Sequence, residues 1–264
     1  MCQECGCGLS KGDVKIGAHT HLHDHDHGHD HSHNHGHHHE HHAHAHGPQT
    51  ITLNRSLMEK NALLAERNRG SFKARKLLVL NVVSSPGSGK TTFIRETAAR
   101  LGKKLRVGVI VGDLATDNDA ARLRTAGVPV IQITTGTVCH LDADMVSKAA
   151  AQLELDKLDV LVIENVGNLV CPADYDLGED LRVVLLSTTE GEDKPLKYPP
   201  MFHSANVAVV TKSDLASAAG FNREQALDNL RRVSHHAEVF ELSAKTGEGM
   251  QAWLDYLTRQ KQLL

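Results

Sequence analysis

The sequence of 264 residues contains no long hydrophobic run and no large excess of charge of one sign. Its apolar stretches, such as Leu77–Leu80 and Val160–Ile163, fall far short of the roughly 18 residues that a membrane span needs. The net charge is −3, of which residues 1–48 contribute −4, so the remainder carries about +1 and no strong positive field argues for nucleic-acid binding. The first residues, Met1–Cys5, lack the charged and then apolar layout of a secretory signal. We therefore expect a cytoplasmic protein that binds neither a membrane nor a nucleic acid.

Cysteine is scarce, and five cysteines in a reducing compartment favour metal-binding thiolates over disulfides. Three of them form the motif Cys2-x-x-Cys5-Gly6-Cys7. Gly6 allows the chain to fold back so that all three thiols face one ion, and soft thiolates suit Ni²⁺, Zn²⁺ or Cu⁺. If Met1 is removed, the amine of Cys2 is a candidate fourth ligand. The alternative is a set of free thiols, which oxidise readily when they are exposed.

Histidine is the residue that is present in excess. The chain holds 20 histidines, and 16 of them lie between His19 and His46. Such a polar tract cannot bury enough apolar surface to offset chain entropy, so we expect residues 1–50 to form a disordered arm. At neutral pH most of these imidazoles are neutral and can bind metal, in many alternative sets that suit buffering. Alternation with Asp, Gly and Asn distinguishes the tract from an expression tag.

From residue 76 onward, short apolar segments alternate with helical ones, which predicts an α/β fold with a mostly parallel, doubly wound sheet over residues 76–264. The expected strands are Leu77–Val83, Arg106–Val111, Val130–Ile133, Val160–Ile163, Arg182–Leu186, Val207–Thr211 and Ala237–Glu241. The expected helices are Thr91–Leu101, Asn118–Thr125, Asp142–Leu153, Arg223–Val233 and Gly249–Gln260. Residues 51–75 are predicted to form a separate helix with a break at Gly70-Ser71, because apolar residues recur at Ile51, Leu53, Leu57, Met58, Leu63 and Leu64.

A glycine-rich segment between the first strand and helix has the sequence Ser84-Ser85-Pro86-Gly87-Ser88-Gly89-Lys90-Thr91. This is the context of a P-loop, in which backbone N–H groups and a helix N-terminus face phosphate oxygens. Lys90 is the candidate ligand of the β- and γ-phosphates, and the Thr91 hydroxyl is a candidate Mg²⁺ ligand. The usual first glycine is replaced by Ser84. The P-loop alone does not distinguish ATP from GTP.

Two later segments favour guanine. Thr211-Lys212-Ser213-Asp214 resembles the [NT]-K-x-D motif, in which the carboxylate of Asp214 accepts two N–H bonds from guanine. Lys212 is expected to cover the face of the base. Ser243-Ala244-Lys245 follows the next strand, where GTPases carry a loop whose backbone meets the guanine carbonyl.

Carboxylates that end two other strands are candidate switch residues. Asp113 ends the second strand, and Glu164-Asn165-Val166-Gly167 resembles the D-x-x-G loop of GTPases, with Glu in place of Asp. We assign Asp113 to the Mg²⁺ site with Thr91, and Lys90, Asp113 and Glu164 to catalysis. The Gly167 N–H is a candidate sensor of the γ-phosphate, whose loss releases the loop. Asp117 is a candidate to bind Mg²⁺ or to orient water, and it is equally well explained as a strand-end capping residue.

A further metal-ligand set combines Cys139-His140 with Cys171, which both lie beyond expected strand ends. Three ligands leave one tetrahedral position for water or a second subunit. Cys139 and Cys171 are equally compatible with a role as small buried side chains. Cys171 lies four residues after Gly167, so a nucleotide-driven movement of that loop would reach a metal ligand directly.

These motifs together resemble the HypB family of hydrogenase nickel-incorporation GTPases. The matching segments are Cys2-x-x-Cys5-Gly6-Cys7, the His-rich arm, Ser85–Thr92, Cys139–Asp142, Ile163–Pro172 and Glu190–Pro199. Without this resemblance, the segment Glu190–Pro199 is interpreted as an ordinary surface loop. The replacement at Ser84 is shared with this family.

The resemblance implies a P-loop GTPase of the signal-recognition/MinD class (SIMIBI type) that binds GTP or GDP with Thr92 among the phosphate-binding residues. It implies a GTP-linked homodimer with an interfacial metal site at Cys139, His140 and Cys171, and a tight nickel site at Cys2, Cys5 and Cys7. The implied role is nickel delivery to the large subunit of [NiFe]-hydrogenase together with HypA. Urease maturation, metal storage and a general ATPase are the alternatives, and Ni²⁺ and Zn²⁺ share the same ligands.

Overall fold

The computed structural model describes residues 49–102, 104–114 and 118–264. Its seven strands form one sheet in the order β3-β2-β4-β1-β5-β6-β7, and every pair is parallel. The strands are β1 (Leu78–Ser84), β2 (Val107–Asp113), β3 (Val130–Thr134), β4 (Val160–Glu164), β5 (Leu181–Ser187), β6 (Val207–Thr211) and β7 (Glu238–Glu241). The predicted strands are confirmed with ends shifted by at most two residues, and the sheet is wholly rather than mostly parallel.

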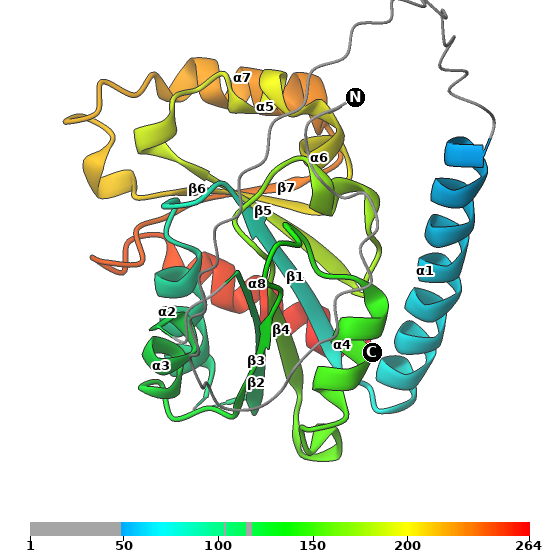
Figure 1. Ribbon diagram of the computed structural model, residues 1–264. Helices are drawn as coiled ribbons and strands as arrows, with labels where there is room; N and C mark the ends of the chain where they lie inside the picture. Colours follow the sequence, from blue (N-terminus) through cyan, green and yellow to red (C-terminus); the bar gives the residue numbers. More distant parts are fainter. Residues whose placement is uncertain (1–48, 103, 115–117) are drawn as a thin grey trace, which may run out of the picture. The chain divides into compact units, whose positions relative to one another are not determined.

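Helices cover both faces of this sheet (Figure 1). They are α1 (Gln49–Ala74), α2 (Lys90–Leu101), α3 (Asn118–Arg124), α4 (Ala143–Ala150), α5 (Lys194–Lys197), α6 (Pro199–His203), α7 (Arg223–Val233) and α8 (Met250–Gln262). Short 3₁₀ turns lie at η1 (Leu155–Lys157), η2 (Cys171–Asp174), η3 (Thr188–Glu190) and η4 (Ser213–Leu215). None of the helices in the described part of the chain is long and apolar enough to cross a membrane.

One face of the sheet packs against α2, α3 and α8, and the other against α1, α4, α6 and α7. Trp253 of α8 is fully buried and donates its indole N–H to Thr97 Oγ1 of α2 at 3.0 Å. β1, β4 and β5 are buried along their whole length because helices lie on both sides. The carboxyl ends of these strands therefore meet at one rigid edge, where an open α/β sheet places its ligands.

Two local expectations were wrong. The break at Gly70-Ser71 does not occur, because Gly70 lies on the exposed side of α1 and Phe72, which is 3% exposed, anchors the next turn in the core. The segment after Glu190 is not a plain surface loop. The turn η3 ends at Glu190 and has a capping box closed by Ser187 and Glu190, and the segment after it forms α5 and α6.

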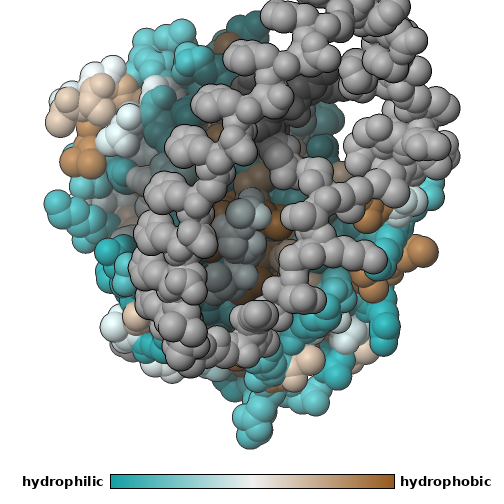
Figure 2. All heavy atoms as spheres, viewed as in Figure 1, coloured by the Kyte–Doolittle hydropathy of each residue, from teal (hydrophilic) through white to brown (hydrophobic). Residues whose placement is uncertain are grey.

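The apolar residues that predicted α1 are not the residues that attach it. Leu57 and Leu63 are 51% and 75% exposed, whereas Asn61 and Asn68 are buried. The Nδ2 atom of Asn61 donates to Asp176 O at 2.9 Å, and that of Asn68 donates to Ala143 O at 2.8 Å. The face of the described residues that Figure 2 shows is mostly hydrophilic, and its apolar areas are small and separate.

Candidate nucleotide and metal sites

The phosphate loop joins β1 to α2 and borders a cleft of about 410 Å³. Gly87 and Gly89 have φ angles of 75° and 96°, a backbone region that favours glycine. Lys90 begins α2, and its Nζ donates to Ser84 Oγ at 3.0 Å. Burial lowers the pKa of Lys90, and the nearby Glu164 opposes this shift. The cleft thus places a buried lysine and a helix N-terminus where a phosphate would be bound.

Glu164 lies at the end of β4 and faces the same cleft. Its Oε1 accepts a hydrogen bond from Thr91 Oγ1 at 2.8 Å. Its Oε2 is buried and has no hydrogen-bond partner among the described residues. Burial raises the pKa of Glu164 to about 7, while Lys90 and the Thr91 hydrogen bond oppose the shift. An unsatisfied buried carboxylate oxygen beside a hydroxyl is a donor set that fits a hard cation such as Mg²⁺.

Other residues of the cleft come from three separate segments. Asp113 ends β2, and its Oδ1 accepts the Leu114 N–H at 2.7 Å. Asp119 and Arg122 of α3 also border the cleft. No sequence motif marks them, because helix α3 brings them to the cleft only in the folded chain. Thr92 lines both this cleft and the adjacent pocket described below.

Gly167 lies against the phosphate loop. A Cβ at this position would approach the Cα of Pro86 to 3.2 Å, which is tighter than most side-chain contacts. The absence of a side chain therefore permits the close approach of the Glu164–Gly167 loop to the P-loop. Asp117 lies outside the described residues, so its predicted role stays open.

A second pocket of about 300 Å³ adjoins the phosphate cleft and contains the predicted guanine-binding residues. Thr211, which replaces the usual Asn, donates from Oγ1 to Ser88 O at 3.0 Å and so ties β6 to the phosphate loop. Lys212 adopts φ 58°, and its Nζ donates to Gly87 O at 2.7 Å. Its aliphatic stem lies beside Gly89, because a Cβ added at Gly89 would be 3.7 Å from Lys212 Cε.

Asp214 is held by the loop that follows β7. Its Oδ1 accepts a hydrogen bond from Ser243 Oγ at 2.6 Å, and Ser243 is fully buried. Ala244 and Lys245 line the same pocket. The structure thus brings the two predicted base-recognition segments together at one pocket.

One cation at the phosphate loop was not predicted from the sequence. Lys194 at the start of α5 donates from Nζ to Ser85 Oγ at 3.3 Å, and it lies 5.2 Å from the centre of the Tyr198 ring. The only indication in the sequence was that Lys194 lies in the segment Glu190–Pro199, which matches the family but has no role assigned by the resemblance. The fold of this segment carries a third lysine to the P-loop, besides Lys90 and Lys212.

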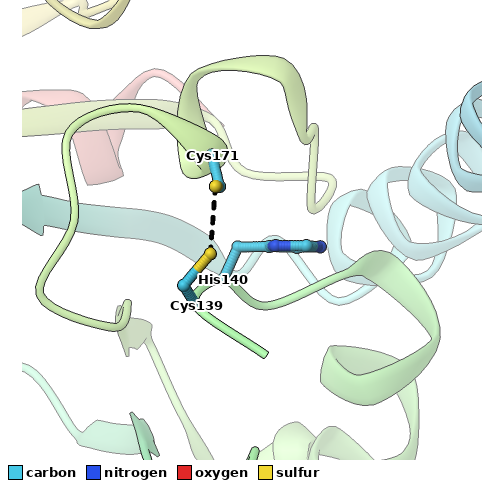
Figure 3. A group of neighbouring side chains, drawn as sticks. All are labelled: Cys139, His140 and Cys171. Atoms are coloured by element: carbon cyan, nitrogen blue, oxygen red, sulfur yellow. Dashed lines mark hydrogen bonds between the residues drawn. The ribbon is translucent and has the colours of Figure 1, made fainter. Parts of the chain in front are cut away.

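Within the described residues, the structure brings Cys139, His140 and Cys171 together as a candidate metal-ligand cluster. Their ligand atoms all lie within 4.8 Å of one another. The two sulfur atoms face each other at 2.9 Å, and the His140 ring lies to one side of the pair (Figure 3). Cys139 comes from the loop after β3, and Cys171 begins η2. Both cysteines are partly accessible rather than fully buried.

The His140 ring is fixed by stacking on Tyr175, with ring centres 3.8 Å apart and an angle of 27°. Burial lowers the pKa of His140. A neutral imidazole is the form that ligates a metal. The Nδ1 atom of His140 is buried without a hydrogen-bond partner in the described part of the chain. The predicted ligands Cys2, Cys5 and Cys7 and the histidines of residues 19–46 lie outside the described residues.

Comparison with known proteins shows the family to which this chain is related. The family model "CobW/HypB/UreG, nucleotide-binding domain" matches residues 78–241. The hydrogenase maturation factor HypB of Escherichia coli K12 is 53% identical over 205 residues, which cover 78% of this chain and 71% of that protein. HypB of Azotobacter vinelandii is 50% identical over 211 residues, which cover 80% and 70% of the two chains.

Two solved structures have the same architecture. HypB from Helicobacter pylori in complex with nickel is 41% identical, with a TM-score of 0.74 over 77% of this chain and 95% of that chain. HypB from Archaeoglobus fulgidus is 37% identical, with a TM-score of 0.72 over 77% and 99%. Fold and phosphate loop define the class as P-loop nucleotide-binding proteins. Within that class, the chain belongs to the HypB family of hydrogenase maturation factors.

Proposed function

We propose that the chain is a GTP-hydrolysing nickel metallochaperone that stores nickel and delivers it to the large subunit of [NiFe]-hydrogenase, with HypA as a partner. The family assignment supports hydrogenase maturation. The Helicobacter pylori relative, whose structure was solved in complex with nickel, supports nickel as the cargo. The connection between the nucleotide cleft and the cysteine pair carries the proposal. The loop from Glu164 to Gly167 borders the cleft, and the same chain reaches Cys171 only four residues later.

GTP is favoured over ATP by the pocket beside the phosphate cleft. A carboxylate only accepts hydrogen bonds, and guanine offers two adjacent N–H donors to Asp214 where adenine offers none on that edge. Competition of GTP, GDP and ATP for a fluorescent guanine nucleotide tests this assignment. GTP and GDP should displace the probe at far lower concentrations than ATP does. Equal displacement by ATP would contradict it.

Hydrolysis is assigned to residues of the phosphate cleft. Lys90 neutralises charge on the β- and γ-phosphates, and Gly167 senses the γ-phosphate through its N–H. Thr91 and Asp113 would hold Mg²⁺, with Glu164 hydrogen-bonded to Thr91 beside them. When bound, the ion supplies charge neutralisation to the phosphates. These roles follow from position in the cleft and from the chemistry of each side chain.

Nickel binding within the folded domain is assigned to Cys139, His140 and Cys171. Two thiolates and one imidazole suit Ni²⁺ and Zn²⁺ alike, and a water or a second copy of the chain completes the set. We place this site at the interface of a GTP-linked homodimer, as in the family. The Cys2, Cys5 and Cys7 motif forms a tight nickel site, and the histidine arm of residues 1–50 is the store.

Hydrogenase activity in cells provides the test. Cys139→Ser and Cys171→Ser should each abolish maturation at low nickel, with partial rescue by added nickel. Removal of residues 1–48 should reduce maturation at low nickel only. If the cysteine variants mature hydrogenase normally at low nickel, the domain does not deliver the metal and the storage alternative is favoured. Urease activity in the same cells checks the second client, because a relative in Helicobacter hepaticus is a hydrogenase/urease maturation factor.

A further inference from the structure

One buried oxygen atom is shared by the nucleotide loop and the metal-ligand loop. Asn165 Oδ1 accepts the N–H of Val166 at 2.9 Å and the N–H of Leu141 at 3.2 Å. Val166 precedes Gly167 at the phosphate cleft, and Leu141 follows His140 of the metal cluster. Asn165 is completely buried. A displacement of either loop therefore acts on the same hydrogen-bonded atom.

The orientation of the Asn165 amide is determined by its neighbours. Its Nδ2 donates to Asn81 Oδ1 at 3.2 Å, and Asn81 Nδ2 donates to Glu179 Oε1 at 3.0 Å. A carboxylate only accepts, so the amide of Asn81 must turn its nitrogen toward Glu179 and its oxygen toward Asn165. Asn165 must then turn its oxygen toward the two loops. Rotation of this amide by half a turn would leave donors facing donors.

The same network continues to the other side of the metal cluster. Arg182 Nε donates to Glu179 Oε1 at 3.0 Å, and its Nη2 donates to Tyr175 O at 2.8 Å. The ring of Tyr175 stacks on His140. Arg182 Nη1 also donates to Ala173 O at 3.0 Å, within the turn that Cys171 begins. The buried chain of hydrogen bonds thus holds both segments that carry the ligands.

We propose that Asn165 is a positioning residue that couples nucleotide state to nickel affinity at Cys139, His140 and Cys171. The proposal rests on the function proposed above. Ordering of the loop by a γ-phosphate moves the Val166–Gly167 backbone, and Asn165 Oδ1 moves with it. The Leu141 N–H then either moves with Asn165 Oδ1 or loses this hydrogen bond. Because an unpaired buried N–H costs free energy, the metal-ligand loop is drawn along with Asn165. The direction of His140 relative to the two sulfur atoms changes as a result.

The test uses the full chain with Cys2→Ser, Cys5→Ser and Cys7→Ser. Cys139 and Cys171 are then its only thiols, so nickel–thiolate absorption reports on their cluster alone. Nickel affinity is measured with GDP and with a non-hydrolysable GTP analogue. We expect the two affinities to differ roughly fivefold or more in this background, and Asn165→Ala to bring their ratio within about twofold of one.

Asn61→Ala is the matched control. Asn61 also makes two hydrogen bonds at 2.9 Å, a partly buried one from its Nδ2 to Asp176 O and a buried one from Ala143 N to its Oδ1, but these do not involve the Glu164–Gly167 loop. Its loss should lower stability and leave the affinity ratio unchanged. A merely structural role of Asn165 would give the same result as the control, and an unchanged ratio in Asn165→Ala overturns the proposal.

Two further outcomes are distinguishable. If the background chain already shows equal affinities with both nucleotides, the coupling in the proposed function fails before Asn165 is altered. If Asn165→Ala does not fold, Asn81→Ser replaces it. That change removes the acceptor of the Asn165 Nδ2 group and leaves Asn165 Oδ1, the atom shared by the two loops, in place. We expect Asn81→Ser to reduce the ratio, and an unchanged ratio there overturns the proposal.

Discussion

Thr91 Oγ1 donates a hydrogen bond to Glu164 Oε1 at 2.8 Å, across 73 residues of sequence. The bond joins the first turn of α2, where the phosphate loop ends, to the end of β4, where the switch-like loop begins. One carboxylate oxygen is thereby occupied and the other is left buried without a partner among the described residues. A cation bound at this point would find an acceptor already oriented.

The first prediction concerns the pH dependence of stability without nucleotide or metal. Burial raises the pKa of Glu164 from 4.5 to about 7. The folded chain therefore holds this proton more tightly than the unfolded chain. The contribution to stability is complete below pH 4.5 and is lost as the pH rises to about 7, by about 3 kcal/mol. Glu164→Gln should remove this loss and be the more stable chain at pH 8.

Urea unfolding of both chains between pH 4.5 and 8 measures this difference. Thr91→Val serves as the control, because it removes the hydrogen bond that opposes the shift and keeps the carboxyl group. Its pH dependence should be at least as steep as that of the unaltered chain. Parallel stability curves for Glu164→Gln and the unaltered chain would contradict the prediction.

The second prediction concerns guanine recognition. Ser243→Ala removes the 2.6 Å hydrogen bond to Asp214 Oδ1. Hydrogen bonds to charged groups contribute about 1.5–3 kcal/mol, so the Kd for GDP should rise by roughly tenfold or more. Calorimetric titration with GDP and ATP measures the effect. Because the phosphate loop is untouched, the affinity for ATP should stay the same, and a parallel loss of both affinities would indicate damage to the whole site.

The third prediction concerns the ring that supports His140. Tyr175→Ala removes the stacked partner, whose centre lies 3.8 Å from that of the imidazole. Loss of groups that orient a ligand typically weakens metal binding about 10- to 100-fold, and we expect a decrease in that range for nickel at the cysteine pair. Tyr175→Phe retains the ring and should bind nickel nearly as well as the unaltered chain. Equal losses in both variants would assign the effect to the hydroxyl group instead of the stacking.

Strand ends were the part of the site that the sequence predicted well. Glu164 ends a strand that is apolar on both faces, and Lys90, Thr91 and Asp214 lie shortly after such strands; parallel strands bring their carboxyl ends to one edge. The strand pattern therefore places these residues together before any contact is known. Thr211 was in doubt because it replaces Asn, and the structure shows that its hydroxyl reaches Ser88 O at 3.0 Å.

Contacts between segments without a local pattern were not predicted. Lys194 reaches Ser85 through the fold of α5, and no spacing in the sequence relates the two. The attachment of α1 by Asn61 and Asn68 differs from its apolar periodicity, because Leu57 and Leu63 are exposed and side-chain hydrogen bonds to distant backbone groups hold the helix beside the buried Phe72. Asn165 was visible only as a member of a loop motif. Its two acceptor contacts depend on tertiary structure.

The last prediction concerns the ion pair inside the buried network. Arg182 and Glu179 are joined at 3.0 Å, with side chains only 9% and 6% exposed. Burial acts to raise the pKa of Glu179, but the Arg182 charge and the Asn81 hydrogen bond outweigh it and lower the pKa. Arg182→Met leaves a buried carboxylate without its charge partner, which should cost about 3–5 kcal/mol of unfolding free energy at pH 7. The deficit should shrink as the pH falls, because protonation then removes the unpaired charge.

Arg106→Met is the matched control for this prediction. The Arg106–Asp159 pair has the same 3.0 Å separation, but the arginine side chain is 62% exposed. Water already screens that pair, so its loss should cost at most about 1 kcal/mol. Chemical denaturation of the two variants at pH 7 and pH 5 compares them. Equal losses of unfolding free energy at pH 7 would show that the burial of Glu179 does not determine the size of the loss. A large loss confined to Arg182→Met would show that the charge of Arg182 is what permits a buried carboxylate at Glu179.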